Sequence, residues 1–246
     1  MIDREFWEHP LTPATRLLCP SCRVGHLRLV PESLKYAEPK ASRLAKGEDD
    51  WEPVWITYRF VALLKCDNSS CMEPSVVHGT GCVGPDPEDG GYESPFCDKF
   101  YPRFVSPSPD LFEIPTMCPQ NVAAGIRKAF TLSWGDYDVC ANQIRVALEL
   151  LLTERNVPRY TMKNGRRTLL TLHSRIDKFD NLSSAKNKHL SDLMKAVKWL
   201  GNVGSHGADK TKALERGDVF DAFDLLQYVV DELYARVHHG LRNWHK

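Results

Sequence analysis

The spacing of apolar residues changes near Pro115, and this change divides the chain into two kinds of structure. Beyond Pro115, apolar residues recur at steps of three and four, which places them on one face of an α-helix. Long stripes of this kind cover residues 137–152 and 219–237, and shorter ones cover 119–133, 167–178 and 185–203. The pattern predicts about five helices joined by short loops, a bundle, with Asp218 as the N-cap of the last helix.

The first 114 residues have a different character, because turn-forming residues interrupt short strand-like runs. Residues 54–64 are rich in β-branched and aromatic side chains and predict a strand. Residues 31–53 and 84–95 are polar or acidic and predict loops, and the proline-rich residues 101–115 predict a linker. We therefore expect an α+β protein, with a small β domain over residues 1–114 and an all-α bundle over residues 115–246.

Four of the eight cysteines fall into two closely spaced pairs, Cys19 with Cys22 and Cys66 with Cys71. Zinc prefers four soft ligands in a tetrahedron, and a short turn between two cysteines presents two thiolates at a suitable angle. With a strand leading into the second pair, the pattern is typical of a zinc ribbon with a long insertion. Four thiolates leave no position for water, so the expected role of the zinc is structural.

Two other interpretations of these cysteines stay open at this point. They could be free thiols, or Cys19 and Cys22 could be a redox pair, although no helix signal follows them as thioredoxin-type motifs require. The remaining cysteines lack pair-like spacing: Cys82, Cys97 and Cys118 have no assigned role, and Cys140 lies on an apolar helical stripe and is expected in the core.

The formal net charge is zero, but the charge is unevenly distributed along the chain. Residues 1–114 carry 12 basic and 18 acidic residues, whereas residues 115–246 carry 20 basic and 14 acidic residues. Within the second part, residues 155–212 hold 13 basic and four acidic residues. Such a field attracts polyanions, because neutralising phosphates releases counterions. The alternative is a solvated basic face that docks on the acidic part of the chain.

Several segments of the second half together resemble a known family. They are Pro115, the run Val122–Phe130, the segment Arg145–Glu149 and the segment Gly201–His206, in the order and approximate spacing of the domain of unknown function 4145 family. The resemblance covers residues 115–237. It implies a helical domain of the HEPN superfamily, and it agrees with the cysteine pairs, since that family often carries an N-terminal zinc-binding segment.

Two sets of polar residues in this half are candidates for a site. Arg145 and Glu149 are one helical turn apart and can pair or face a shared cleft. Lys198, Asn202 and His206 are spaced by four, so a helix continuing through residue 206 would align them. Gly201 and Gly204 indicate either close packing or a helix end nearby.

The resemblance implies metal-independent RNA cleavage for this site. HEPN ribonucleases use an arginine and a histidine separated by four to six residues, and they usually act as dimers with two copies of the motif at the interface. Here Asn202 and His206 match the second part of the motif, but no arginine stands in register. Lys198 or Arg145 would have to supply the cation that stabilises the phosphate transition state.

Two functions follow as hypotheses. The first is an RNA-directed, dimeric endoribonuclease effector of prokaryotic anti-phage defence. The second is a non-catalytic module that binds nucleic acid or a protein partner and carries a degenerate HEPN site. Because no signal peptide layout and no membrane-spanning run is found, a cytoplasmic location without membrane contact is expected.

Overall fold

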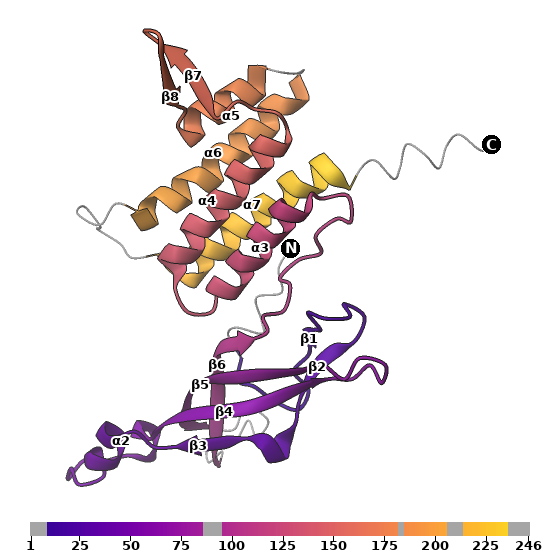
Figure 1. Ribbon diagram of the computed structural model, residues 1–246. Coiled ribbons are helices and arrows are strands. Elements are labelled where there is room, and N and C mark those ends of the chain that lie inside the picture. Colours follow the sequence, from indigo (N-terminus) through magenta and orange to yellow (C-terminus); the bar gives the residue numbers. More distant parts are fainter. Residues whose placement is uncertain (1–8, 86–94, 182–184, 206–213, 236–246) are drawn as a thin grey trace. The chain divides into compact units, whose positions relative to one another are not determined.

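The computed structural model describes residues 9–85, 95–181, 185–205 and 214–235 (Figure 1). These residues form two compact units that divide between Asp110 and Leu111. We call them the β unit, residues 9–110, and the helical unit, residues 111–235. The chain therefore has the mixed α+β character predicted from its sequence. In the described part, no helix has the length and apolar content needed to cross a bilayer.

The β unit is built on one antiparallel sheet (Figure 1). Its strands are β1 (Leu17–Leu18), β2 (His26–Leu29), β3 (Lys35–Ala37), β4 (Thr57–Cys66), β5 (Pro74–Pro85) and β6 (Phe96–Ser106). They pair in the order β1-β2-β4-β5-β6, and β3 also pairs with β4. Strand β4 is long enough for β2 to pair with one of its ends and β3 with the other.

Strand β4 shows why this sheet has a single buried face. Its residues alternate strictly between exposed and buried, as expected when successive side chains point to opposite faces. The buried members include Phe60 and Leu64, which are almost fully enclosed. On the buried face, Phe60 and Phe100 of β6 pack edge to face with ring centroids 5.3 Å apart.

The pairing of β5 with β6 is interrupted by an irregularity between His78 and Gly79. The backbone of β6 approaches Gly79 so closely that a Cβ there would collide with the carbonyl oxygen of Tyr101. The residue opposite Gly79 is Pro102, which has no N–H to donate. Both residues fit the rule that glycine and proline within sheets mark bulges and edge strands.

Two predictions for the N-terminal region were wrong in part. Residues 31–53 are not a continuous loop, because they include β3 and the short helix α2 (Lys40–Ala45), flanked by 3-10 turns at Pro31–Ser33 and Pro53–Trp55. The predicted linker 101–115 begins inside β6, because pairing with β5 continues to Ser106. Most of the predicted loop 84–95 lies outside the described residues.

The helical unit contains α3 (Gln120–Leu132), α4 (Tyr137–Glu154), α5 (Leu172–Asn181), α6 (Ala185–Ser205) and α7 (Arg216–Tyr234). It is not all-α, however, since β7 (Tyr160–Lys163) and β8 (Arg166–Leu169) form a hairpin between α4 and α5. The helix predicted over 167–178 therefore starts later, at Leu172, because residues 166–169 pair as a strand. The hairpin stands out from the helices of its own unit (Figure 1).

The core of the helical unit is apolar and includes a cluster of three aromatic rings. Phe112, Phe130 and Phe223 are buried, with ring centroids 5.0 to 6.4 Å apart. Cys140 is fully buried on α4, and its thiol donates to the carbonyl oxygen of Ala129 on α3 at 3.2 Å. The expectation that Cys140 is a core residue is confirmed.

Helix ends follow ordinary capping chemistry. Asp136 caps α4 by accepting the backbone N–H of Val139 at 2.9 Å. The N-cap of α7 is Glu215, not the predicted Asp218. Asp218 occupies the third helical position, where its carboxylate accepts the N–H of Glu215 at 2.8 Å in a capping box.

Replacing Asp136 by alanine should lower the free energy of unfolding of the helical unit by about 1 kcal/mol, because one N–H at the start of α4 loses its acceptor. Urea denaturation followed by far-UV circular dichroism measures this change. Asp136→Asn keeps an acceptor of similar capping strength and is the matched control. Equal destabilisation by both variants would contradict the capping role.

Candidate metal centre and basic pocket

The sheet brings the two cysteine pairs together. Cys19 and Cys22 lie in the turn between β1 and β2, whereas Cys66 and Cys71 lie at the turn between β4 and β5. Because β2 pairs with β4 in a register that sets Leu27 opposite Cys66, the two turns become neighbours. The residues inserted between the two cysteine pairs include β3, α2 and most of β4.

The four sulfur atoms form a compact cluster. The Sγ atoms of Cys19 and Cys71 are 3.8 Å apart, those of Cys22 and Cys66 are 3.7 Å apart, and all four lie within 4.8 Å of one another. A tetrahedron with Zn–S bonds of about 2.3 Å has S–S edges of about 3.8 Å. The prediction that both pairs build one cluster is confirmed, and its dimensions suit a tetrahedral metal ion.

The cluster is held by backbone donors and by burial. Cys22 Sγ accepts the N–H of Gly25 at 3.3 Å. The backbone bonds from Gly25 and Val24 lower the pKa of the Cys22 thiol to about 6. Burial raises the pKa of Cys66 to about 12 in the absence of a cation. A bound metal ion reverses that tendency, because a coordinating thiol is deprotonated.

Asp67 links the two turns on the outside of the cluster. One carboxylate oxygen accepts the N–H of His26 at 2.7 Å, and the other accepts Nε of Arg28 at 3.0 Å. The bond from His26, followed by that from Arg28, lowers the pKa of Asp67. The carboxylate therefore fixes β2 against the turn that carries Cys71.

Such a centre is suited to a structural role and not to catalysis. Cys19 and Cys66 are buried, all four positions around a metal would be filled by sulfur, and no position is left for water or substrate. Among the other cysteines, Cys118 is buried like Cys140, while Cys82 and Cys97 are half-buried. None of these belongs to the cluster.

Of the predicted catalytic residues, Arg145 and Glu149 lie on α4, and Lys198 and Asn202 lie on α6. The Nε atom of Arg145 and the Oε1 atom of Glu149 are 3.8 Å apart. Lys198 is half-buried. The pKa of Asp177 on α5 is lowered mainly by the hydrogen bond from Lys195, and the charge of Lys198 also lowers it. Helix α6 includes Gly201 and Gly204 and is described as far as Ser205. The side chain of Asn202 and all of His206 lie outside the described residues.

A pocket of about 260 Å³ adjoins Arg145 and Glu149. We call it the basic pocket, since Arg159 and Arg175 also line it, together with residues 169–172. Helix α4 supplies its first wall, the base of the hairpin its second and the start of α5 its third. The backbone of Arg159 closes the base of the hairpin, because its carbonyl oxygen accepts the N–H of Leu170 at 2.9 Å.

Arg175 is the most unusual residue of this pocket, because its side chain is only 2% exposed. Its Nη atoms donate to the carbonyl oxygen of Glu149 at 3.0 Å, to Oγ1 of Thr153 at 2.8 Å and to the carbonyl oxygen of Val157 at 3.2 Å. Its buried Nε has no partner among the described residues. Burial lowers the pKa of Arg175. The negative charge of Glu149 raises this pKa, and the positive charge of Arg159 lowers it further.

The β7–β8 hairpin carries more basic and apolar side chains to the same region. It turns at Asn164 and Gly165, both with positive φ, which suits a two-residue type I′ turn. The cross-strand partners Tyr160 and Leu169 share a face with Met162 and Arg167. The Arg167 guanidinium lies 3.8 Å from the centre of the Tyr160 ring.

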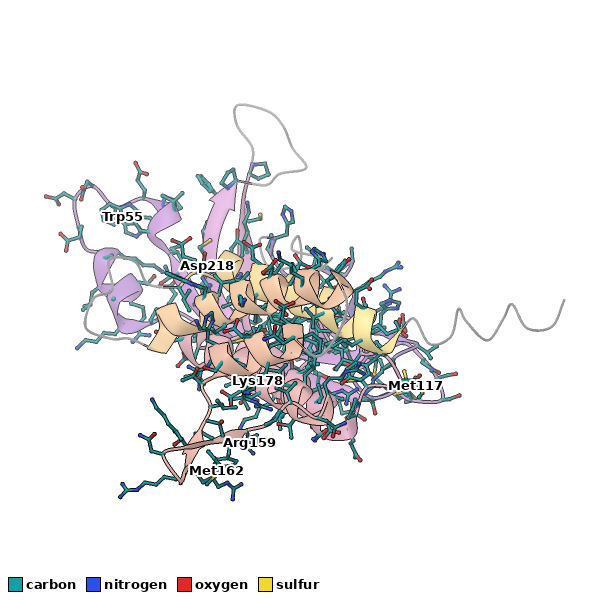
Figure 2. The ribbon with its side chains drawn as sticks, turned by 90° about the horizontal axis from the view of Figure 1, so that it is seen from above. Trp55, Met117, Arg159, Met162, Lys178 and Asp218 are labelled. Carbon is teal, nitrogen blue, oxygen red and sulfur yellow. The ribbon has the colours of Figure 1, made fainter. Side chains whose placement is uncertain are left out.

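Figure 2 labels Arg159 at the base of this hairpin and Met162 further along it, away from the helices of the unit. Met162 and Leu169 are strongly exposed for apolar residues, and Leu169 also lines the basic pocket. The hairpin face and the basic pocket therefore form one continuous surface. Sequence reasoning missed Arg159, Arg167 and Arg175, although Asn164-Gly165 is a strong hairpin signal.

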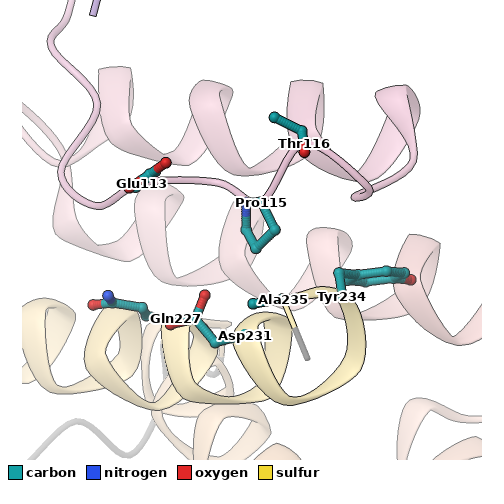
Figure 3. Close-up of a pocket in the computed structure, with 7 residues that line it drawn as sticks. All are labelled: Glu113, Pro115, Thr116, Gln227, Asp231, Tyr234 and Ala235. Atoms are coloured by element: carbon teal, nitrogen blue, oxygen red, sulfur yellow. The ribbon is translucent and has the colours of Figure 1, made fainter. Parts of the chain in front are cut away.

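A second cavity of the helical unit, about 310 Å³, has the opposite chemistry (Figure 3). Gln227, Asp231 and Tyr234 of α7 face Glu113 and Pro115, which precede α3. Burial raises the pKa of Asp231 and raises that of Tyr234 to about 12. With two carboxyl groups and no basic side chain in its lining, this cavity does not suit an anion.

Comparison with known proteins matches each unit to a family of unknown function. Residues 10–105 match the domain of unknown function DUF8608, and residues 127–242 match the domain of unknown function DUF4145. The second match supports the resemblance to that family found in the sequence. Searches of the curated proteins and of the solved structures gave no match.

Replacing Gly25 by alanine should weaken metal binding by about 10- to 100-fold, as is typical when the surroundings of metal ligands are disturbed. A Cβ at this position would lie 2.7 Å from Cys66 Sγ and 2.7 Å from Asn68 Cβ. Titration with Co²⁺, followed through the absorbance of cobalt–thiolate bonds, measures the affinity.

Gly47→Ala is the control for this experiment, because a Cβ at Gly47 meets only the carbonyl oxygen of Leu44, at an ordinary 3.5 Å. Unchanged cobalt affinity in Gly25→Ala would show that the four sulfurs do not form the site.

Proposed function

We propose that the protein is an RNA-directed, HEPN-like protein whose helical unit contacts RNA and whose β unit is a zinc ribbon stabilised by one structural zinc ion. The observation that carries this proposal is the continuous basic surface formed by the basic pocket and the β7–β8 hairpin. The match of residues 127–242 to DUF4145 and the four-sulfur cluster support its two parts.

Zinc is the metal that the cluster suits best. Four thiolates in a tetrahedron favour zinc or an iron–sulfur type of centre, and zinc needs no redox partner. The backbone N–H bond to Cys22 and the clamp made by Asp67 are the outer contacts that such a site requires. Because the four ligands come from two turns that are far apart in the sequence, a bound metal ion would join these turns and contribute directly to folding of the β unit.

Metal analysis of the purified chain should find about one zinc per chain, because the cluster has four sulfur ligands for one ion. Removal of the metal by a chelator should lower the unfolding temperature of the β unit. Cys66→Ser should reduce the zinc content, whereas Cys82→Ser, outside the cluster, should not. Zinc-free wild-type protein with an unchanged melting profile would contradict the proposal.

RNA fits the chemistry of the helical unit's basic surface. Guanidinium groups bind phosphates, and exposed aromatic rings or guanidinium planes stack on unpaired bases. The stacked pair of Tyr160 and Arg167 offers such a platform for a base. Single-stranded segments, whose bases are accessible, are therefore the expected targets. The 13 basic residues within 155–212 add a long-range attraction for the same polyanion.

Cleavage of that RNA is proposed through His206, together with Asn202. Lys198 and Asn202 are one turn apart on α6, and the proposal extends the same spacing of four residues to His206. The histidine would move a proton at the 2′-hydroxyl or the leaving oxygen, and Lys198 or Arg145 would stabilise the charged phosphate. Such an activity suits an effector of anti-phage defence in the cytoplasm.

A homodimer through the helical unit belongs to the same proposal. Trp199 of α6 is 70% exposed, close to the proposed catalytic segment of the helix. Large exposed aromatic residues are typical of interfaces. The alternative function is a non-catalytic module that binds nucleic acid or a partner protein, and the β unit would then make the specific contact.

Incubation of the purified protein with total RNA and with transfer RNA in EDTA tests cleavage. We expect fragments from the wild type and a loss of about 10²- to 10⁴-fold in rate for His206→Ala, because a general acid or base is removed. His189→Ala, which removes a histidine of α6 outside the motif, is the control.

RNA binding without cleavage would contradict the ribonuclease proposal and support the non-catalytic alternative. Binding that persists in His206→Ala but is lost in Cys66→Ser would assign the contact to the β unit.

A further inference from the structure

We propose that the basic pocket is a binding site for a terminal phosphate, either in a phosphate monoester at an RNA end or on a mononucleotide, or as free orthophosphate. This inference goes beyond the proposed function, because it requires neither RNA cleavage nor Asn202 and His206. It rests on the arrangement of Arg145, Arg159 and Arg175 around one cavity.

The first argument is the buried charge of Arg175. Its two Nη atoms bond only to neutral oxygens, and within the described residues no carboxylate oxygen lies within ion-pair distance of its guanidinium, although the charge of Glu149 acts on it from further away. Burying a cation without a counterion is costly. The buried and unpartnered Nε is a second sign of an incomplete site, since such atoms in native proteins usually indicate an absent ion or water.

The second argument is the balance of charge in the lining. Glu149, the acidic member, lies 3.8 Å from the Arg145 guanidinium and also acts on the charge of Arg175. This one carboxylate faces the guanidinium groups of Arg145, Arg159 and Arg175, so two positive charges of the lining are not offset by it. A phosphate monoester carries a charge of about −1.5 to −2 at neutral pH, which matches them better than the single charge of an internal phosphodiester.

The third argument is the shape and support of the cavity. Its volume of about 260 Å³ exceeds what a phosphate group alone requires, and the leucines at 169, 170 and 172 give it an apolar side. Arg175 is held rigidly by the end of α4, whereas Arg159 is exposed and can move onto a ligand. Thr171, which caps α5 by accepting the N–H of Ser174 at 3.2 Å, also lines the cavity.

These features favour a ligand with a charged phosphate and an attached body of nucleoside size. The phosphate would lie between the accessible guanidinium groups of Arg145 and Arg159, over the buried Arg175, and the attached group would lie against the leucines and the exposed face of the hairpin. Charge-assisted bonds to arginine are the strongest hydrogen bonds available to such a group.

Isothermal titration calorimetry of the full chain tests the inference with four probes: orthophosphate, adenosine 5′-monophosphate, and one short single-stranded RNA with either a 5′-phosphate or a 5′-hydroxyl. We expect the monoester probes to bind and the phosphorylated RNA to bind about tenfold or more tightly than the hydroxyl form, given the strength of hydrogen bonds to charged groups. Arg159→Gln should abolish this difference.

Arg155→Gln is the matched control, because it removes the same charge from an exposed residue of the same unit that does not line the pocket. Arg145→Gln is a second test that leaves the buried Arg175 in place, and it should also weaken monoester binding. Arg159 is exposed, so its replacement is not expected to impair folding.

The outcomes separate this inference from the proposed function. Binding of orthophosphate and the mononucleotide that depends on Arg159, without RNA binding, supports the pocket and contradicts the RNA-directed function. Equal binding of both RNAs, unaffected by Arg159→Gln and Arg145→Gln, supports RNA binding and overturns the pocket. Loss of monoester binding that is as large in Arg155→Gln also overturns it, because a general charge effect would then suffice.

Discussion

The helical unit depends on one buried guanidinium, that of Arg175. It donates to the carbonyl oxygens of Glu149 and Val157 and to Thr153, where α4 ends. Glu149 and Thr153 belong to the last turns of α4 and Val157 follows its end, and a cation at the C-terminal end of a helix complements the helix dipole. Because Arg175 belongs to α5, the same contact fixes the start of α5 and the base of the hairpin that joins the two helices.

This arrangement explains why the basic pocket and the exposed face of the β7–β8 hairpin lie side by side. Residues 155–171 separate the end of α4 from the start of α5, and the hairpin occupies most of that interval. Its free end carries exposed basic and apolar side chains, whereas its base closes the pocket. The rigid part of the site is thus supplied by helices and the adaptable part by a hairpin.

The sequence predicted those features that depend on local pattern. The strand at β4, the helices α3, α4, α6 and α7 and the cysteine cluster follow from periodicity of apolar residues and from ligand spacing. The hairpin at β7–β8 was overlooked because residues 167–178 also satisfy a helical spacing, and only Asn164-Gly165 distinguishes the two. Arg175 could not be identified, since its role depends on the tertiary approach of α4 and α5.

The irregularity opposite Gly79 has a further consequence for how the β unit behaves in a crowded solution. Strand β6 forms one edge of the sheet, and an open edge is a template onto which another chain's strand can add. Pro102 has no N–H to offer along this strand, and the register shift beside Gly79 leaves Arg103 as an extra residue that bends β6. Gly79, which lets the two backbones approach, and Pro102 therefore break the regular edge onto which a further strand could add.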